Sequence, residues 1–416
     1  MRTGVQRLYL LLIGLQTLAA SLIWGINTLF LLDAGLSNFE AFAANAFFTA
    51  GMVIFEVPTG VVADTRGRRM SYLLGSASLS LTTLLYLAMW WLGAPFWAWA
   101  IASTSLGLGF TFFSGALEAW LVDALAYTGH FDAGGTLDEV LARGEIVEGA
   151  AMLLGSVAGG LIAQATSLGV PYALRAIVLV CNFLLAFVAM RDLGFAPARG
   201  ASPLQALQRV LRASIDHGLR APPIRWVMLG AVFTDGVSFY AFYAMQPYLL
   251  QLWGDERAFG IAGIAAAVVA GAQIVGGLLV PMVRRVARRR TSVLLAGTAL
   301  GAASLAAIGL FPHLWIAISL LVVWALTFAA LMPVRQAFLN GLLASEERAT
   351  VLSFASLLGS GGGVVAQPAL GRAADAWGYP ASYLCGAGLQ ALALPFLWLA
   401  RRTRASSDPI PRGGGP

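Results

Sequence analysis

Three charged residues lie inside long apolar segments of the sequence. Asp235, Glu118 and Arg335 each fall within a run long enough to span a bilayer as a helix, where a charge near the centre costs about 2.5–3.5 kcal/mol. Asp235 has no basic neighbour in the sequence. If this carboxyl is buried and unpaired, its protonated form is favoured near neutral pH, as proton coupling requires. The alternative is a neutral aspartic acid that is hydrogen-bonded within a helix interface.

The composition places most of the chain in a membrane. Hydrophobic residues make up 59% of the 416 residues and charged residues 11%, and the mean hydropathy is +0.78. These values exclude a water-soluble globule. We therefore predict an all-α integral membrane protein with twelve transmembrane helices. The predicted helices lie near residues 8–32, 41–63, 71–92, 96–125, 145–167, 171–190, 224–251, 258–283, 292–311, 313–343, 349–370 and 380–400.

The 26 basic residues are all arginines, and most of them fall on one side of the predicted helices. By the positive-inside rule, that side and both termini lie in the cytoplasm, so we expect a multi-pass protein of the cell membrane. This placement accounts for the net charge of +6 without nucleic acid as a partner.

An internal repeat divides the chain into two halves. The segments "LLGSVAGGLIAQ" at 153–164 and "LLGSGGGVVAQ" at 357–367 match almost letter for letter, and the same alignment sets Glu118 against Arg335. Such a duplication predicts two six-helix halves around a shared site. The expected domains are residues 1–190, a cytoplasmic linker at 191–223 that carries an amphipathic helix over 202–215, residues 224–400, and a disordered tail at 401–416.

A compact charged turn, "FEVPTGVVADTRGRRM" at 55–70, separates the second and third predicted helices. Glycine at Gly60 permits close helix packing, and glycine at Gly67 permits a tight reversal. The acid Asp64 precedes the reversal, and Arg68 and Arg69 follow it.

This turn resembles the signature GxxxDRxGRR of the major facilitator superfamily, with Thr65 in place of the first arginine. The resemblance implies a twelve-helix secondary transporter that works by alternating access. It also implies that Asp64 docks on the start of a later helix, near Ala349 and Thr350, where free backbone N–H groups favour an anion. The turn would then act as a latch that closes the inner side.

The fifth predicted helix holds a second, weaker match. Its segment "GSVAGG" resembles the GPxxGG element of antiporters in this superfamily, with Ser156 in place of proline. This match points to Gly155, Gly159 and Gly160. The alternative is that these glycines serve close helix packing.

The resemblance implies that the first, fourth, seventh and tenth helices line a central cavity. Glu118 and Arg335 would then form an ion pair across the halves, as a gate or a binding group, or as a permanent structural bridge. The other side chains expected to line a mainly apolar cavity are Asn27, Phe239, Phe242, Gln246, Trp324 and Phe328.

A second group of charges is expected near the inner ends of the helices, around the latch. Its predicted acids are Glu56, Asp123, Glu145 and Glu148, and its predicted bases are Arg68, Arg69 and Arg143. We interpret this group as structural or gating.

No Walker sequence is present, and the three histidines are too scattered for a metal site or a catalytic triad. We therefore predict neither an enzyme nor a bound cofactor. The sequence favours a monomeric transporter that exports small organic molecules in exchange for protons. Uptake by proton symport and a non-transporting membrane sensor are the alternatives.

Overall fold

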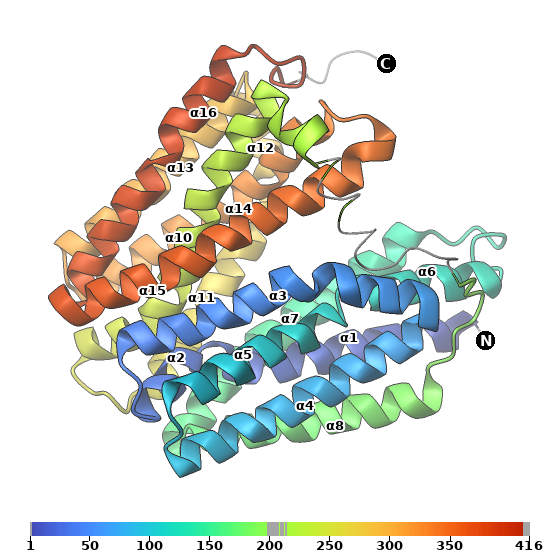
Figure 1. Ribbon diagram of the computed structural model, residues 1–416, viewed down its shortest axis with the longest axis horizontal. Helices are drawn as coiled ribbons and strands as arrows, with labels where there is room; N and C mark the ends of the chain where they lie inside the picture. Colours follow the sequence, from blue (N-terminus) through green and yellow to red (C-terminus); the bar gives the residue numbers. More distant parts are fainter. Residues whose placement is uncertain (1, 198–207, 209–211, 213, 411–416) are drawn as a thin grey trace. The chain divides into compact units, whose positions relative to one another are not determined.

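The computed structural model describes residues 2–197, 208, 212 and 214–410 (Figure 1). Within that part the chain is helical, apart from turns and one isolated β-bridge between Arg289 and Pro409. Eleven of the described helical stretches are long and apolar enough to span a membrane. The last of them, residues 350–402, is broken by the non-helical backbone of Gly378 (φ 82°), so the described part holds twelve spans. The predicted all-α membrane fold is confirmed.

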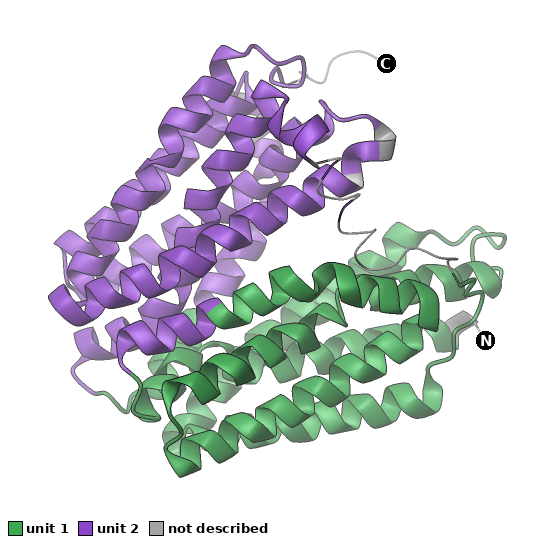
Figure 2. Ribbon diagram, viewed as in Figure 1, with its two compact units in different colours: residues 1–36, 47–206, 256–267 green, residues 37–46, 207–255, 268–416 purple. Residues whose placement is uncertain are grey.

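The chain divides into two compact units (Figure 2). Unit 1 consists of Met1–Leu36, Phe47–Ala206 and Glu256–Ala267, and unit 2 of Ser37–Ala46, Leu207–Asp255 and Val268–Pro416.

Unit 1 is built mainly from the helices of the first half. They are α1 (Arg2–Trp24), α2 (Asn27–Asp33), α3 (Asn38–Arg66), α4 (Arg68–Leu92), α5 (Phe96–Thr111), α6 (Ala116–Tyr127), α7 (Leu137–Ala165) and α8 (Gly169–Ala189). Helix α1 packs against α7 and α8, and α4 packs against α5 and α8. The first residues of α3 belong to unit 2.

Unit 2 repeats this plan with the later helices. They are the short π-helical turn η1 (Ser214–Leu219), α10 (Pro222–Trp253), α11 (Phe259–Leu278), α12 (Val280–Val286), α13 (Arg290–Leu310), α14 (Leu314–Asn340), α15 (Ser345–Ala391) and α16 (Ala393–Arg402). Helix α10 packs against α15 and α16, and α13 packs against α14 and α15. The first residues of α11 belong to unit 1.

Four predicted spans are interrupted. The run at 8–32 breaks between α1 and α2, the run at 96–125 between α5 and α6, the run at 258–283 at Leu279 between α11 and α12, and the run at 380–400 at Leu392 between α15 and α16. Gly115, at the start of α6, has φ of 67°, a left-handed conformation that glycine adopts without steric cost. Apolar composition sets the length of a span but does not report such local breaks.

The end of the chain differs from the prediction of a disordered tail. In the described residues of this segment, 401–410, Asp408 accepts two hydrogen bonds from α13. The backbone N–H of Arg290 donates to its carbonyl (2.8 Å), and the backbone N–H of Thr291 donates to its carboxylate (2.9 Å). The Ser407 hydroxyl donates to the carbonyl of Phe338 (2.7 Å). These bonds fix Ser407 and Asp408 on the start of α13 and the end of α14. The amphipathic helix predicted over 202–215 lies largely outside the described residues.

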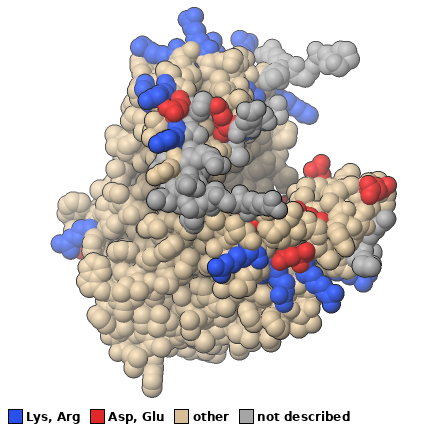
Figure 3. Space-filling view, turned by 45° about the vertical axis from the view of Figure 1, so that its right-hand side comes forward, with Lys and Arg blue, Asp and Glu red and all other residues tan. Residues whose placement is uncertain are grey.

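Charged side chains are confined to a few groups on the face shown in Figure 3, and broad areas between them carry none. Many large apolar side chains are exposed on the spans, among them Leu81, Trp91, Leu154 and Val188. Apolar surface of this extent suits a bilayer, because lipid tails replace the protein core as its surroundings.

Candidate functional site

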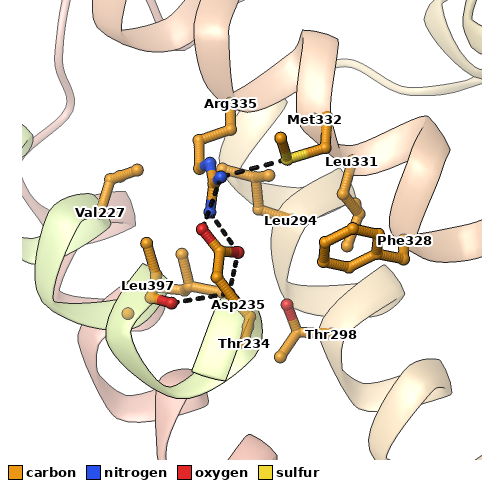
Figure 4. A pocket seen from close by; sticks show the side chains of 12 residues that line it. Val227, Thr234, Asp235, Leu294, Thr298, Phe328, Leu331, Met332, Arg335 and Leu397 are labelled. Carbon is orange, nitrogen blue, oxygen red and sulfur yellow. Dashed lines mark hydrogen bonds and ion pairs between the residues drawn. The ribbon is translucent and has the colours of Figure 1, made fainter. Parts of the chain in front are cut away.

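The Asp235 carboxylate and the Arg335 guanidinium form a two-bond ion pair within unit 2 (Figure 4). Arg335 Nη1 donates to Asp235 Oδ1 (2.8 Å), and Nη2 donates to Oδ2 (2.9 Å). Asp235 lies on α10 and Arg335 on α14, so the pair joins two helices. Bidentate geometry of this kind gives the strongest form of charge-assisted hydrogen bond.

Local contacts hold both partners in place. The Thr234 hydroxyl donates to Asp235 Oδ1 (3.1 Å), and Arg335 Nη2 also contacts the sulfur of Met332 (3.1 Å). Gly359 of α15 lies directly against the Asp235 side chain, which occupies the space that a Cβ at position 359 would need. Only 13% of the Asp235 side chain and 17% of the Arg335 side chain are exposed. The pair is therefore positioned by three helices and largely withdrawn from solvent.

A small cavity of about 30 Å³ adjoins the pair. Most of its lining is apolar, and Thr234, Thr298, Asp235 and Arg335 supply its polar groups. A cavity needs roughly 10–15 Å³ of such volume to hold one water molecule. The site therefore has room for water, and for a proton to reach the carboxylate, but not for an organic molecule.

One prediction about these charges is wrong: Asp235 is not unpaired, because Arg335 lies beside it although 100 residues separate them in the sequence. Both terminal nitrogens of Arg335 bind Asp235, and its expected pairing with Glu118, which belongs to the other unit, stays a prediction. Glu118 is exposed in unit 1 and interacts electrostatically with Tyr9 and Glu148.

The other residues expected to line a cavity have varied surroundings. Gln246 is fully buried, Phe242 and Trp324 are buried, and Trp324 stacks on Phe328 with ring centroids 5.8 Å apart. Phe328 is the member of this set that borders the ion-pair cavity.

Two further members of the predicted cavity set pack against neighbouring helices. Phe239 lies against Gly363. Asn27, in unit 1, accepts a hydrogen bond from the Tyr172 hydroxyl (2.9 Å). A role for these side chains in substrate binding stays a prediction.

The charged turn of unit 1 forms a compact network around Gly67. Its φ of 105° is in the left-handed region, and a Cβ there would collide with the Asp192 carboxylate, so glycine is required twice over. Asp192 accepts from the backbone N–H of Arg69 (2.8 Å). Asp64 pairs with Arg68 (2.5 Å), whose Nε lies 4.0 Å from Asp123.

Sequence reasoning missed Asp192, which follows α8 as the only acid in its stretch and gives no motif signal. The docking of Asp64 near residues 349–350 would involve both units and stays a prediction, as does the role of Gly60.

The expected ion-pair group around this turn is partly wrong. Glu56 accepts a hydrogen bond from the Ser114 hydroxyl (2.8 Å), and Arg143 pairs with Glu139 one turn away (2.6 Å) rather than with Glu145 or Glu148. Helical spacing explains the second result, because residues four apart share a face.

The glycines of the α7 repeat are contact points for neighbouring helices of unit 1. Gly155 lies against the Ser21 side chain, and Gly159 lies against the carbonyl of Leu22. A Cβ on Gly160 would lie 2.8 Å from the Cα of Gly263. These contacts favour close packing as the role of the element, and its link to antiport stays a prediction.

In the described residues, no group of His, Cys, Asp and Glu side chains is arranged to hold a metal ion.

Several transporters of known structure share this architecture. The structure of PepTSo, a POT family transporter, is similar at a TM-score of 0.75 and 12% identity, over 97% of this chain and 98% of that one. The nucleoside transporter NupG is similar at 0.72 and 12%, over 96% and 98%. A bacterial homolog of the human lysosomal transporter Spinster, solved inward-facing and unoccupied, is similar at 0.71 and 16%, over 99% of each chain. At these identities the similarity shows the fold alone.

At the level of sequence, no curated protein matches the chain. The family model of the Major Facilitator Superfamily matches residues 227–416, which include both partners of the ion pair. This match assigns residues 227–416 to the Major Facilitator Superfamily, and the whole chain shares the fold of the transporters compared above.

Proposed function

We propose that this transporter exports small organic molecules across the cell membrane in exchange for protons, by alternating access. The observation that carries the proposal is the ion pair between Asp235 and Arg335. We further propose that both termini are cytoplasmic, and that the protein works as a monomer without catalysis, cofactor or nucleic acid.

The ion pair supports proton coupling because Asp235 is the carboxylate that balances the charge of Arg335 within the described residues. When Asp235 binds a proton, the guanidinium keeps its charge but loses its partner. An unpaired charge at this depth costs several kcal/mol, so Arg335 must move toward water or toward another anion. Protonation of one carboxyl thus favours a different arrangement of α10 and α14. The water-sized cavity beside the pair would supply the proton.

The substrate class follows from what surrounds this centre. The cavity next to the pair is too small for a substrate, so the substrate would bind elsewhere and sense the pair through the two helices. The aromatic and apolar character of the predicted cavity set favours uncharged or amphipathic molecules. The exposed Glu118 makes a cationic group more favourable than an anionic one.

The charged turn would set the preferred conformation. We propose that Asp64, Arg68 and Arg69 form an inner latch, with Gly67 and Asp192 fixing its shape. Asp64→Asn would then weaken the state that is closed on the inner side. Hydrogen exchange at the inner ends of α3 and α15 should increase in this variant, and Glu139→Gln, which removes an exposed pair on α7, should leave it unchanged. Equal exchange in Asp64→Asn and the unmodified protein would refute the latch.

The test of the function is uptake into inside-out vesicles. Vesicles with and without the protein receive a panel of lipophilic cationic and neutral dyes, with and without an imposed pH gradient. Accumulation that requires both the protein and the gradient would support proton-driven export. Accumulation without the gradient would indicate a facilitator. Uptake only into right-side-out vesicles would indicate proton symport, and no movement of any probe would favour the non-transporting sensor.

A further inference from the structure

A second, much larger cavity lies on unit 2, beside the ion-pair cavity. It has a volume of about 620 Å³ and is lined by α12, α13 and α14, which is within the range of about 300–1,000 Å³ of small-molecule sites. Leu279, Met282, Leu300 and Leu326 are among its lining residues, and Met282 and Leu300 are exposed. The cavity is therefore an apolar groove that opens on the outer surface of a membrane-spanning unit.

The groove extends along the membrane-spanning part of α13. Its lining runs on this helix from Ser292, in the first turn, to Leu300. Eight residues of helix correspond to about 12 Å, which is a large part of one leaflet of a hydrocarbon core that is about 30 Å thick. A groove of this length and polarity fits an acyl chain.

One end of the groove carries several positive charges. Ala287 and Ser292 both line it, and between and beside them lie Arg285, Arg288 and Arg289, all exposed. In the described part of the chain, none of these three guanidinium groups forms an ion pair with a carboxylate. Their charge is available to an anion.

The backbone that carries these arginines is held in place. The N–H of Ile410 donates to the carbonyl of Arg288 (3.1 Å), and the carbonyl and carboxylate of Asp408 accept from Arg290 and Thr291. The Arg290 side chain is itself engaged by the carbonyl of Pro409 (3.1 Å). Residues 408–410 thus hold the backbone at the basic end of the groove, and within the described residues the side chains of Arg288 and Arg289 form no ion pair.

We propose that this groove binds an anionic phospholipid, with an acyl chain along α13 and α14 and the phosphate at Arg285, Arg288 and Arg289. Charge complementarity selects the headgroup, because basic sites between membrane helices attract anionic lipids of the cytoplasmic leaflet. The proposal does not depend on the direction or the coupling of transport.

Leu331 gives this site a route to the transport machinery. It lines both the groove and the ion-pair cavity, and its side chain lies against Gly297, where a Cβ would approach it to 2.6 Å. A lipid chain in the groove would therefore restrict the side chain that separates it from Asp235 and Arg335.

Native mass spectrometry of the purified protein, titrated with phosphatidylglycerol or phosphatidylcholine, tests the binding directly. We expect tight retention of phosphatidylglycerol by the unmodified protein and at least tenfold weaker binding by the triple variant Arg285→Gln, Arg288→Gln, Arg289→Gln. The matched control Arg66→Gln, Arg191→Gln, Arg401→Gln removes the same charge from other exposed positions and should bind as the unmodified protein does.

A groove-filling variant separates the acyl chain from the headgroup. Ala296→Phe should weaken phosphatidylglycerol binding with the three arginines intact, in a protein that remains monodisperse and melts within a few degrees of the unmodified one. The proposal would be overturned by equal retention of phosphatidylcholine and phosphatidylglycerol, by the same loss in both triple variants, or by unchanged binding in the first triple and in Ala296→Phe.

Discussion

The two halves of the molecule use the same glycine-rich repeat against different partners. In unit 1, Gly155 of α7 lies against Ser21 of α1, and in unit 2, Gly359 of α15 lies against Asp235 of α10. The two glycines occupy the same place in the repeated sequence. The Ser21 hydroxyl donates to the carbonyl of Leu18 on its own helix (3.1 Å) or to that of Ala151 on α7 (3.0 Å). Asp235 needs a charged partner from a third helix.

The contacts of the glycines and the side chains that face them have different roles. The glycine contacts are common to both halves, so they explain how helices pack and not what the protein does. A serine in this place costs little in an apolar bundle, whereas an ion pair is seldom more stable than well-packed apolar side chains of the same volume. Only one of the two aligned glycines faces a charge pair, which points to a role of that pair in transport.

The largest expected effect is the loss of one partner of the pair. Arg335→Gln leaves a carboxylate in largely apolar surroundings and should destabilise unit 2 by about 3–5 kcal/mol, measured as thermal unfolding in detergent. The double variant with Asp235→Asn removes both charges and should recover most of this loss. If the double variant is as unstable as the single one, packing rather than charge accounts for the effect.

The next largest effect is expected when an aspartate like Asp235 of unit 2 is introduced into unit 1. Ser21→Asp would place a carboxylate opposite Gly155, as Asp235 lies opposite Gly359, but the position that aligns with Arg335 holds Glu118 rather than an arginine. It should therefore cost about 3 kcal/mol in the same unfolding assay. Adding Glu118→Arg should recover part of that stability. Failure of the second substitution to help would show that the two halves are less alike than the repeat implies.

A smaller effect is expected where the halves agree. Gly159 lies against the carbonyl of Leu22, and Gly362 lies against the carbonyl of Val232. Alanine at either position should cost about 1–3 kcal/mol through overpacking. Gly361→Ala is the control on α15, because nothing lies within 4 Å of its Cβ position, and it should unfold no earlier than the unmodified protein. A loss at Gly361 equal to that at Gly362 would contradict the packing argument.

The smallest effect concerns the serine itself. Ser21→Ala removes a hydroxyl whose one hydrogen is shared between the carbonyls of Leu18 and Ala151 and should cost about 0.5–1.5 kcal/mol. Transport should be unaffected, since no charge is involved. A loss of proton-driven transport without a loss of stability would contradict this prediction, because it would show that Ser21 takes part in transport.

Sequence patterns predicted the spans because the thickness of the bilayer sets the length of an apolar run. The repeat identified the glycines that pack against neighbouring helices. The partner of Asp235 was not predictable in this way. Alignment of the halves drew Arg335 toward Glu118, because a repeat reports equivalent positions and not contacts. The break at Gly115 and the docking of Asp408 on Thr291 also escaped prediction, since each depends on local backbone geometry or on a distant partner.

The most direct test of the account is proton-driven accumulation by Asp235→Asn in inside-out vesicles, beside Ser21→Ala at equal protein content. The amide keeps the shape and the packing against Gly359 but cannot carry the proton. We predict that Asp235→Asn binds substrate and lets it equilibrate but does not accumulate it when a pH gradient is imposed, whereas Ser21→Ala accumulates it normally. Gradient-driven accumulation by Asp235→Asn at the level of the unmodified protein would contradict the proposal that this ion pair couples protons to transport.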